Sequence, residues 1–262
     1  MQYSNSLQTE MLQTERGYSI AYQHYTPKQS SQNQPGIIFL HGHGSDMFGG
    51  KAEAIMNWAV GRDIEFTRFD LFGHGVTGGD IMTATVGQWL KDARDILDKV
   101  TSRKQIIIGS SLGGWIMLAL SKYRHEKINS MVGIAAAPDF TKHLIWERLD
   151  KSEQEAFRKN GLHSAPNPYG DTDTLYPYQL ICEAENHLVL EHDIRFDGAV
   201  ILHHGLCDAE VPWQTAIQIA EKLSSNQVTI HFDKTATHRY SEYEQLNSLI
   251  SSIRGLVTDY NS

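Results

Sequence analysis

The sequence predicts a doubly wound α/β fold built around a mostly parallel sheet. Short apolar runs recur along the chain without polar alternation, which is typical of parallel strands covered by helices on both faces. Amphipathic stretches with helical spacing lie between these runs, so strands and helices alternate. Because α/β domains of 262 residues commonly stay undivided, we expect a single domain over residues 1–262.

Six apolar segments are the predicted strands of this sheet: residues 36–40, 64–69, 105–108, 131–135, 199–202 and 228–232. Helical spacing is clearest in one set of residues after the second strand and in another near the end of the chain: Trp89, Ala93, Ile96, Leu97 and Val100, then Tyr243, Leu246, Ile250 and Ile253. Before the first strand, Tyr18, Ile20 and Tyr22 alternate with polar neighbours and predict an antiparallel hairpin at the sheet edge.

One interval, residues 138–198, breaks this alternation. It contains no clear sheet strand, although predicted strands flank it on both sides. Two helical stretches are expected inside it, around residues 144–157 and 178–190. An insertion of this size between strands commonly covers a binding site, so we expect a helical lid. A peripheral packing element is the alternative.

The composition narrows the classes of function. The formal net charge of −8 argues against a nucleic-acid partner, whose phosphates need a basic surface. No apolar run approaches the roughly 20 residues that span a bilayer. The two cysteines, Cys182 and Cys207, lack metal-site spacing and fit a reducing compartment. The first residues have neither a basic start nor an apolar core of signal-peptide length, so we expect a cytoplasmic protein.

A candidate nucleophile, Ser111, stands in the motif Gly109-Ser110-Ser111-Leu112-Gly113. The motif follows the apolar run at residues 106–108 and precedes a helical stretch at residues 115–120, which is the strand, turn and helix context of a nucleophile elbow. The two glycines matter because such a tight turn leaves no room for a Cβ on either neighbour. We therefore expect Ser111 to be presented as a catalytic nucleophile.

Two further residues complete a predicted catalytic triad. A serine hydroxyl becomes a good nucleophile when an imidazole takes its proton, and the imidazole needs a carboxylate to orient it. Asp208 and His238 follow Ser111 in the chain, each in a loop after a predicted strand. Parallel strands bring such loops to one edge of the sheet. We predict Ser111 as nucleophile, His238 as base and Asp208 as the acid.

Asp139, which follows the preceding strand, is the alternative acid. Asp208 is favoured because residues 208–213 have the character of a loop that leads into a helix. Among the thirteen histidines, only His238 combines a loop position, the carboxyl side of the last strand and a place after the acid.

Acyl transfer also needs N–H donors for the negative charge that grows on the carbonyl oxygen. The backbone N–H of Leu112 follows the nucleophile at a helix N-terminus, and by position the N–H of His43 supplies the second donor. We do not expect a metal site at His41 and His43, because no comparable ligand set accompanies them. The glycine runs match neither a dinucleotide fingerprint nor a P-loop.

Large apolar and aromatic residues near these loops are candidate substrate-binding residues. Met47 lies beside the oxyanion loop, Trp115 behind the nucleophile, Trp213 after the acid and Trp146 in the lid. Further candidates share this character: Phe48, Leu144, Tyr176 and Tyr178. Such a lining would suit an acyl or aryl group.

Together these motifs resemble the α/β-hydrolase superfamily over nearly the whole chain. The glycine-rich elbow with Trp115, and the segments at residues 50–52, 68–70 and 211–213, are similar to a mitochondrial group of abhydrolases that are palmitoyl-protein thioesterases and acyl-glucuronide esterases. The resemblance implies an α/β-hydrolase fold with a mostly parallel sheet of about eight strands and a helical lid between the sixth and seventh strands. It also implies Ser111, Asp208 and His238 as triad. No organelle-targeting presequence is evident, which again predicts a cytoplasmic location.

We therefore expect a serine hydrolase that cleaves small carboxylic esters or acyl thioesters through an acyl-enzyme on Ser111, without a cofactor or metal ion. Two alternatives remain open. The same triad could cleave a carbon–carbon bond or act as a perhydrolase, because function belongs to the site and not to the fold. A non-catalytic binding or scaffold relative would also share the fold. The sequence leaves the acyl chain length, the leaving group and the oligomeric state open.

Overall fold

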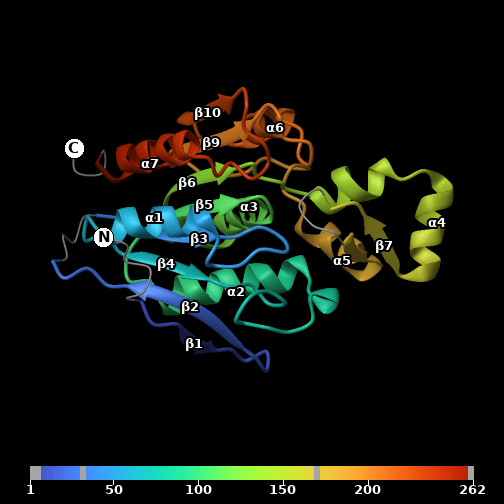
Figure 1. Ribbon diagram of the computed structural model, residues 1–262, viewed down its shortest axis with the longest axis horizontal. Coiled ribbons are helices and arrows are strands. Elements are labelled where there is room, and N and C mark those ends of the chain that lie inside the picture. Colours follow the sequence, from blue (N-terminus) through green and yellow to red (C-terminus); the bar gives the residue numbers. More distant parts are fainter. Residues whose placement is uncertain (1–6, 30–33, 168–171, 259–262) are drawn as a thin grey trace.

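An eight-stranded sheet forms the centre of the molecule, with helices on both faces (Figure 1). This computed structural model describes residues 7–29, 34–167 and 172–258. The strand order is β1-β2-β4-β3-β5-β6-β9-β10. The strands are β1 (Glu10–Gln13), β2 (Ser19–Tyr25), β3 (Gly36–Leu40), β4 (Phe66–Phe69), β5 (Gln105–Ser110), β6 (Ile128–Ile134), β9 (Val200–Gly205) and β10 (Val228–Asp233).

The neighbouring strands β4, β3, β5, β6, β9 and β10 run parallel to one another. At one edge β1 and β2 form an antiparallel hairpin, in which β2 is paired to β4. The predicted doubly wound sheet, with its hairpin at the edge, is therefore confirmed.

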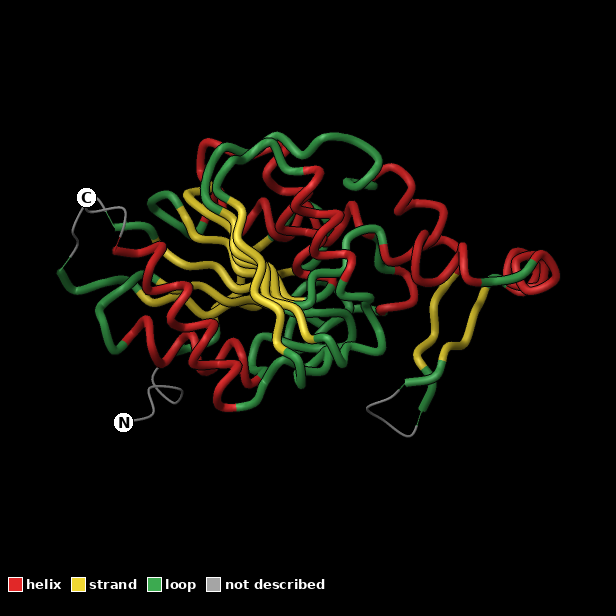
Figure 2. Tube along the Cα trace, turned by 90° about the horizontal axis from the view of Figure 1, so that it is seen from above, coloured by secondary structure: helices red, strands yellow, loops and turns green. Residues whose placement is uncertain are grey.

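Helices cover the two faces of the sheet in separate layers (Figure 2). One layer contains α1 (Gly50–Val60) and α7 (Tyr243–Thr258), and the other contains α2 (Val86–Lys99), α3 (Leu112–Arg124) and α6 (Gln214–Lys222). Alternate strand residues divide between the layers: Ile37 packs on the side of α1, whereas Ile38 packs on the side of α2 and α3. Both faces of the strands are therefore buried, which explains their continuous apolar runs.

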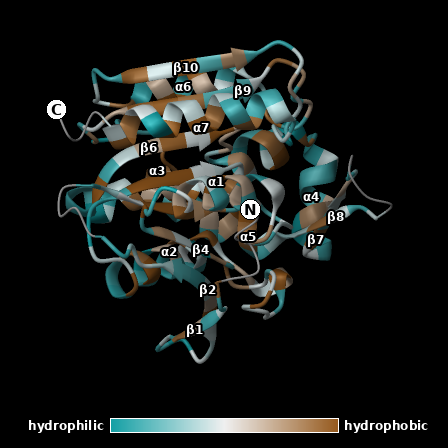
Figure 3. Ribbon diagram, turned by 60° about the vertical axis from the view of Figure 1, so that its left-hand side comes forward, coloured by the Kyte–Doolittle hydropathy of each residue, from teal (hydrophilic) through white to brown (hydrophobic). Residues whose placement is uncertain are grey.

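The helix α3 lies deepest and is buried continuously from Leu112 to Ser121. In Figure 3 the strands at the centre of the sheet are mainly hydrophobic, whereas α4, far from the sheet, is largely hydrophilic. A helix that is apolar on all sides must be enclosed by protein, and its N-terminus is then fixed firmly to the core. That N-terminus is where Ser111 lies. Two short helical turns lie next to these helices in the chain: η1 (Ile81–Thr83) precedes α2, and η2 (His125–Lys127) follows α3.

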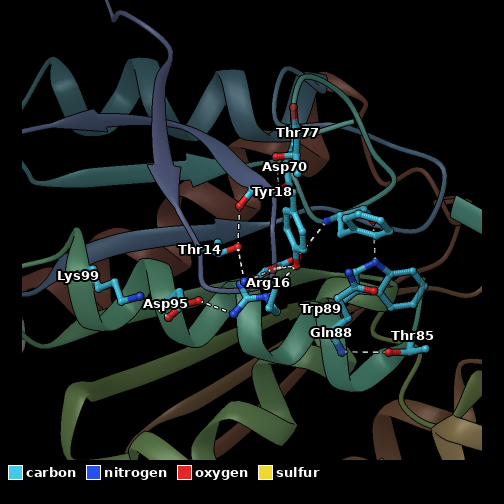
Figure 4. Close-up of polar contacts among 12 residues, drawn as sticks. Thr14, Arg16, Tyr18, Asp70, Thr77, Thr85, Gln88, Trp89, Asp95 and Lys99 are labelled. Carbon is cyan, nitrogen blue, oxygen red and sulfur yellow. Dashed lines mark hydrogen bonds and ion pairs between the residues drawn. The ribbon is translucent and has the colours of Figure 1, made fainter. Parts of the chain in front are cut away.

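The N-terminal hairpin is anchored to α2 by charged groups (Figure 4). Arg16, in the turn between β1 and β2, donates to Asp92 at 2.8 Å and to Asp95 at 2.6 Å. The Tyr18 hydroxyl donates to the same Asp92 carboxylate at 2.6 Å. Because the Asp92 side chain is fully buried, these donors replace the water that its charge has lost.

Between β6 and β9 the chain leaves the sheet and forms an inserted segment that projects from one end of the molecule (Figures 1 and 2). Its elements are η3 (Thr141–Ile145), η4 (Trp146–Arg148), α4 (Lys151–Asn160), β7 (Leu162–Ala165), β8 (Thr174–Pro177), α5 (Tyr178–Ala184) and η5 (Glu185–His187). The described part of this segment adds no strand to the main sheet. It does contain a separate two-stranded hairpin, β7 with β8, that the apolar pattern did not predict.

The helices of the inserted segment are also shorter than expected. The first predicted stretch divides at Asp150, whose side chain forms a capping box with Glu153 and starts α4. The second ends at residue 187, after which the chain forms turns and bends and one isolated bridge, at Ile194, before β9 begins. In the described part of the chain, none of the helices is long and apolar enough to cross a bilayer.

Candidate active site

Ser111 lies in a sharp turn between β5 and α3, where the backbone is strained. Its φ of 53° and ψ of −117° lie outside the regions that L-residues readily adopt. A Cβ on Gly109 would lie 2.3 Å from the Gly113 carbonyl oxygen, and one on Gly113 would lie 2.2 Å from the Leu40 carbonyl oxygen. Both glycines are therefore required by the close approach of β3, β5 and α3. The turn holds Ser111 at the carboxyl end of β5.

A chain of hydrogen bonds joins Ser111, His238 and Asp208. The Nε2 atom of His238 is 3.0 Å from Oγ of Ser111, and its Nδ1 atom is 2.8 Å from Oδ2 of Asp208. Because an ionised carboxylate can only accept, Nδ1 carries the ring proton and Nε2 accepts from the serine hydroxyl. The loops after β9 and β10 bring these side chains together, since the ends of the two strands, Gly205 and Asp233, are paired in the sheet.

Asp208 is ionised although its side chain is fully buried. Burial alone would raise its pKa, but hydrogen bonds from His204, His238 and the backbone N–H of Val211 hold the pKa of this carboxyl well below its usual range. Its Oδ1 atom accepts from the N–H groups of Glu210 and Val211, both at 2.9 Å. The negative charge is thus ready to orient and stabilise a protonated His238.

The loop that carries His238 is fixed on both sides of the imidazole. Before it, Asp233 accepts a hydrogen bond from the backbone N–H of Thr235 at 2.9 Å. After it, the ammonium group of Lys51 in α1 donates to the carbonyl oxygen of Arg239. Burial, together with the nearby Arg239 charge, lowers the pKa of Lys51 to about 8. The loop position therefore depends on α1 as well as on β10.

The loop after β3 passes directly beside the serine. A Cβ on Gly42 would lie 3.2 Å from Cβ of Ser111, so the backbone of Gly42, one residue before His43, borders this serine. On the other side, Leu112 is the first residue of α3, and its N–H has no acceptor within the helix. The backbone of Gly42 and that of Leu112 therefore border Ser111.

Two neutral histidines hold this loop in place. The N–H of Leu71 donates to Nε2 of His41, and the N–H of Gly44 donates to Nε2 of His74, each at 3.1 Å. Burial lowers the pKa of His41 to about 4, and burial with the neighbouring His41 charge lowers the pKa of His74 to about 4. At neutral pH both rings are uncharged, so each Nε2 has a lone pair to accept with.

Aromatic rings from three parts of the chain surround the His43 side chain. Its ring centroid lies 5.9 Å from Trp89 of α2, 6.3 Å from Phe140 after β6 and 5.5 Å from Tyr176 of β8. Phe140 also packs edge-on against Trp115 of α3 at 5.6 Å. Burial, with two neighbouring histidines, lowers the pKa of His43 to about 3. This aromatic wall, which starts one residue after Gly42, is therefore uncharged, and the core and the inserted segment both contribute to it.

The family of the chain follows from comparison with known proteins. A model described as the alpha/beta hydrolase family matches residues 37–199. The chain belongs to the alpha/beta hydrolase family. In this hydrolase the matched region runs from β3 to the residue before β9 and contains both the Ser111 turn and the inserted segment. The resemblance predicted from the motifs is confirmed.

Curated relatives of this hydrolase include palmitoyl-protein thioesterase ABHD10 of several mammals. The mouse protein is 36% identical over 233 residues, which cover 88% of this chain and 77% of the mouse protein. The human protein is 34% identical over 231 residues, which cover 88% of this chain and 75% of the human protein.

Solved structures give the same result. Mouse alpha/beta hydrolase domain-containing protein 10 matches with a TM-score of 0.88 at 34% identity, over 96% of this chain and 99% of the other. A putative hydrolase from Agrobacterium vitis S4 matches with a TM-score of 0.90 at 31% identity, again over 96% and 99%. Est1E from Butyrivibrio proteoclasticus, with a TM-score of 0.77 and 16% identity, shares the fold. The protein is a hydrolase.

These relatives contradict the expected location. The composition and the first residues predicted a cytoplasmic protein, and that prediction is wrong, because the relatives at 34–36% identity are named as mitochondrial proteins. The composition of a globular enzyme reflects its solubility and its core, which are alike in both compartments. A low cysteine count is equally uninformative here, because it does not separate one reducing compartment from another.

This hydrolase brings some of the predicted site residues together and leaves others apart. Ser111, Asp208 and His238 are hydrogen-bonded in a row, and Trp115 joins the aromatic wall through Phe140. Met47 is fully buried, and its N–H donates to an Asp70 carboxylate oxygen at 2.7 Å, so it supports the loop after β3.

The two other tryptophans that were predicted to line the pocket have different neighbours. Trp213 is 36% exposed and packs its ring against Phe232 of β10. Trp146 packs against Phe157 and Tyr178 inside the inserted segment. Trp213 directly precedes α6, and Trp146 is the first residue of η4. The spacing of apolar residues along the sequence could not show which neighbouring side chains each ring would contact.

Asp139, the alternative acid, binds backbone groups of the inserted segment. Its carboxylate accepts from the N–H of Val189 at 2.9 Å and from the N–H of Leu190 at 2.8 Å. His74 and Phe140, whose ring centroids lie 5.7 and 6.3 Å from that of His43, were not predicted from the sequence. Phe140 directly follows a strand end, which was a usable signal, whereas His74 lies in a glycine-rich loop without any. Within the described ranges, no group of three or more His, Cys, Asp or Glu side chains is arranged to hold a metal ion.

Proposed function

We propose that this hydrolase cleaves carboxylic esters or thioesters by transferring their acyl group to Ser111. The observation that carries the proposal is the unbroken row of hydrogen bonds from Ser111 through His238 to a buried, ionised Asp208. A thioester is included because the mouse and human relatives are named palmitoyl-protein thioesterases.

In the first step Oγ of Ser111 attacks the carbonyl carbon while its proton moves to Nε2 of His238. Asp208 stabilises the imidazolium through its hydrogen bond to Nδ1. The carbonyl oxygen becomes negatively charged, and the backbone N–H groups of His43 and Leu112 are the proposed oxyanion donors. Each such donor lowers the barrier by about 3 to 4 kcal/mol in other serine hydrolases.

In the second half of the reaction the tetrahedral intermediate collapses, and His238 gives its proton to the departing alkoxide or thiolate. A water molecule then attacks the acyl-enzyme, with His238 again taking a proton, and the acid is released as the Ser111 hydroxyl re-forms. His238 accepts or donates the proton in every proton transfer of this scheme.

The uncharged aromatic wall supports an apolar acyl or aryl group as the part of the substrate that it holds. Trp115, Phe140 and Tyr176 contribute rings to this wall, and Met47 supports the loop beside it. We propose that the segment of residues 138–198 acts as a lid, because Tyr176 from its hairpin reaches the His43 ring.

The first test is a panel of p-nitrophenyl esters and acyl-coenzyme A thioesters with acyl chains of increasing length. We expect the wild type to turn over part of the panel and Ser111→Ala to lose activity by about 10⁴-fold or more, because the nucleophile is absent. Ser121→Ala, which alters a buried serine on the same helix, is the control and should keep its activity.

The ratio of ester to thioester turnover would then decide between the two leaving groups, and the best chain length would measure the pocket. If wild type and Ser111→Ala were equally inactive across the panel, the proposal would be overturned, and carbon–carbon cleavage or binding without catalysis would be favoured.

A further inference from the structure

A second histidine, His204, lies against the carboxylate of the proposed catalytic acid. Its side chain is 1% exposed, and its Nε2 atom lies 3.3 Å from Oδ2 of Asp208. This is the same oxygen that accepts from Nδ1 of His238 at 2.8 Å. Two imidazole rings therefore converge on one oxygen atom of the acid, and the proposed reaction scheme uses only one of them.

The proton on the His204 ring can be located from its partners. The same Nε2 atom lies 3.0 Å from the carbonyl oxygen of Val211. A carbonyl oxygen and an ionised carboxylate can only accept hydrogen bonds, so Nε2 carries a proton. One N–H beside two acceptors forms a three-centre hydrogen bond, in which the Val211 carbonyl is the nearer acceptor and Oδ2 of Asp208 the second. The ring therefore bridges the acid and the backbone next to it.

These contacts close a ring of hydrogen bonds around the Asp208 carboxylate. Val211 donates its N–H to Oδ1 at 2.9 Å, and its carbonyl oxygen accepts from His204, which also reaches Oδ2. With the N–H of Glu210 on Oδ1 and Nδ1 of His238 on Oδ2, each oxygen of the acid has two donors. A rotation of the carboxylate would break several of these contacts at once, so its orientation is fixed.

The His204 ring starts from a rigid part of the sheet, whereas Asp208 lies in a loop. β9, which carries His204, lies between β6 and β10. Directly after this residue, a Cβ on Gly205 would lie 2.1 Å from the Ala236 carbonyl oxygen, so the end of the strand is packed closely against the loop that carries His238. A side chain on a strand is placed more precisely than one on a loop. His204 can therefore fix the acid relative to the sheet.

We propose that His204 is a positioning residue for the acyl transfer: its Nε2–H holds the Asp208 carboxylate in the orientation that His238 needs. The inference rests on the proposed function and adds a fourth side chain to the row of Ser111, His238 and Asp208. His204 lies behind the acid in this row, so it acts on the serine only through Asp208 and His238.

The test compares two amide variants that differ in reach. In His204→Gln the amide nitrogen can take the place of Nε2 and donate to the same two acceptors, whereas the shorter amide of His204→Asn ends near the place of Nδ1. For a p-nitrophenyl ester we expect His204→Asn to lower kcat about ten-fold or more with little change in KM, because the acid loses a donor and the substrate contacts stay. His204→Gln should remain within about three-fold of the wild-type kcat.

The pH profile separates positioning from a general loss of structure. The acidic limb of kcat/KM reports the pKa of the base in the free enzyme, which is His238 in the proposed scheme. In His204→Asn the Asp208 carboxylate has one donor fewer, so its charge favours protonated His238 more strongly and raises the pKa of that ring. We expect the acidic limb to move upward by about half a pH unit in His204→Asn and to stay in place in His204→Gln. A loss of folded protein would lower the rate at every pH without moving the limb.

The matched control is His203→Asn, the same change one residue earlier in β9. Nε2 of His203 lies 3.0 Å from Oγ of Ser252 in α7, and Nδ1 lies 3.2 Å from the Tyr240 hydroxyl. This variant also loses a buried Nε2 contact, but on the opposite face of the strand, because successive side chains of a strand alternate. It should keep both the kcat and the acidic limb of the wild type.

The possible results separate this inference from the proposed function. Unchanged kcat in a folded His204→Asn protein, or a lower kcat without a shifted acidic limb, would overturn the inference while Ser111-dependent hydrolysis kept the proposed function. Equal losses in His204→Gln or in the control would also contradict it, because the donor would then not be the cause. If His204→Asn did not fold, His204→Met, which has a similar volume and no donor, would decide by the same two measurements. Absence of Ser111-dependent hydrolysis for every ester and thioester would refute the proposed function and this inference together.

Discussion

At the scale of single residues, the strained backbone of Ser111 is held by hydrogen bonds on both of its sides. Its N–H donates to the Ile134 carbonyl oxygen at 3.0 Å, and its own carbonyl oxygen accepts from Gly114 and Ala137 at 2.9 and 3.1 Å. Strain of this kind persists only where the surroundings over-determine the conformation. The serine is therefore already in the position that the proposed reaction needs before a substrate arrives.

Lys51 should affect the rate through the position of His238. Lys51→Met removes the hydrogen bond to the Arg239 carbonyl and loosens the loop next to the imidazole. We expect kcat for an ester substrate to fall by about ten-fold with little change in KM, because the substrate-binding wall stays intact and only the base moves.

Steady-state kinetics at saturating ester would measure this effect. Lys91→Met, at an exposed position of α2, is the control. Unchanged kcat in a folded Lys51→Met protein would show that the loop keeps His238 in place without the ammonium group.

The site could be predicted from the sequence where the fold's geometry determines it. Ser111 is recognisable because its turn needs glycines at fixed offsets, and Asp208 and His238 because they follow strands in chain order. The surroundings of His43 could not be predicted in this way. Trp89, Phe140 and Tyr176 come from distant parts of the chain, and only tertiary packing shows that their rings meet at His43.

At the scale of elements, the attachment of the N-terminal hairpin to α2 depends on one buried carboxylate. Asp92 accepts from Arg16, from Tyr18 and from the backbone N–H of Phe72 at 3.0 Å. Its charge is tolerable because every donor is present. Removing one partner of a buried pair leaves an uncompensated charge, which costs more than the pair contributes.

Arg16→Met should therefore destabilise the fold by about 3 kcal/mol, because Asp92 keeps its burial and loses its cation. Urea denaturation followed by circular dichroism would measure the free energy of unfolding. Lys99→Met breaks the more exposed pair with Asp95 and should cost less than about 1 kcal/mol. Equal losses in the two variants would contradict the role given to burial.

The strands of the main sheet could be predicted closely, and those of the inserted segment could not. β3 has the predicted bounds because all of its residues are buried and apolar. β7 and β8 have four residues each, and neither contains a fully buried residue. Their pairing satisfies backbone groups without burying an apolar run, so hydrophobic periodicity carries no signal for them.

At the scale of the whole molecule, the core holds several histidines in their neutral form. Burial lowers the pKa of His203 to about 3, with a contribution from the adjacent His231, and three histidines near Ser111 behave similarly. In the folded protein these rings act as uncharged hydrogen-bond partners. His203, for example, contacts the Tyr240 hydroxyl at 3.2 Å and Ser252 at 3.0 Å.

The stability of the protein should therefore fall steeply in mild acid. Above pH 6.5, the ordinary pKa of histidine, these rings are neutral in both the folded and the unfolded chain. As the pH falls from there toward 4, the unfolded chain takes up protons and the folded protein does not. The free energy of unfolding then falls by about 1.4 kcal/mol per pH unit for each proton taken up.

Urea denaturation at a series of pH values would measure this slope. His203→Asn should lower the slope by about one proton, and substitution of the exposed His125 by Gln should lower it less. A free energy of unfolding that stayed constant between pH 6.5 and 4.5 would contradict the neutral state of the buried rings.

Asp139, near the beginning of the inserted segment, is joined to a later part of it, since its carboxylate binds the N–H groups of Val189 and Leu190. One side chain thus closes the stretch of residues 140–188 into a loop at the carboxyl end of β6. Because the loop is closed by this one carboxylate, a change in its length would leave its two ends in place. Ser111, Asp208 and His238 all lie outside it, so their row of hydrogen bonds would be kept whatever the loop contained.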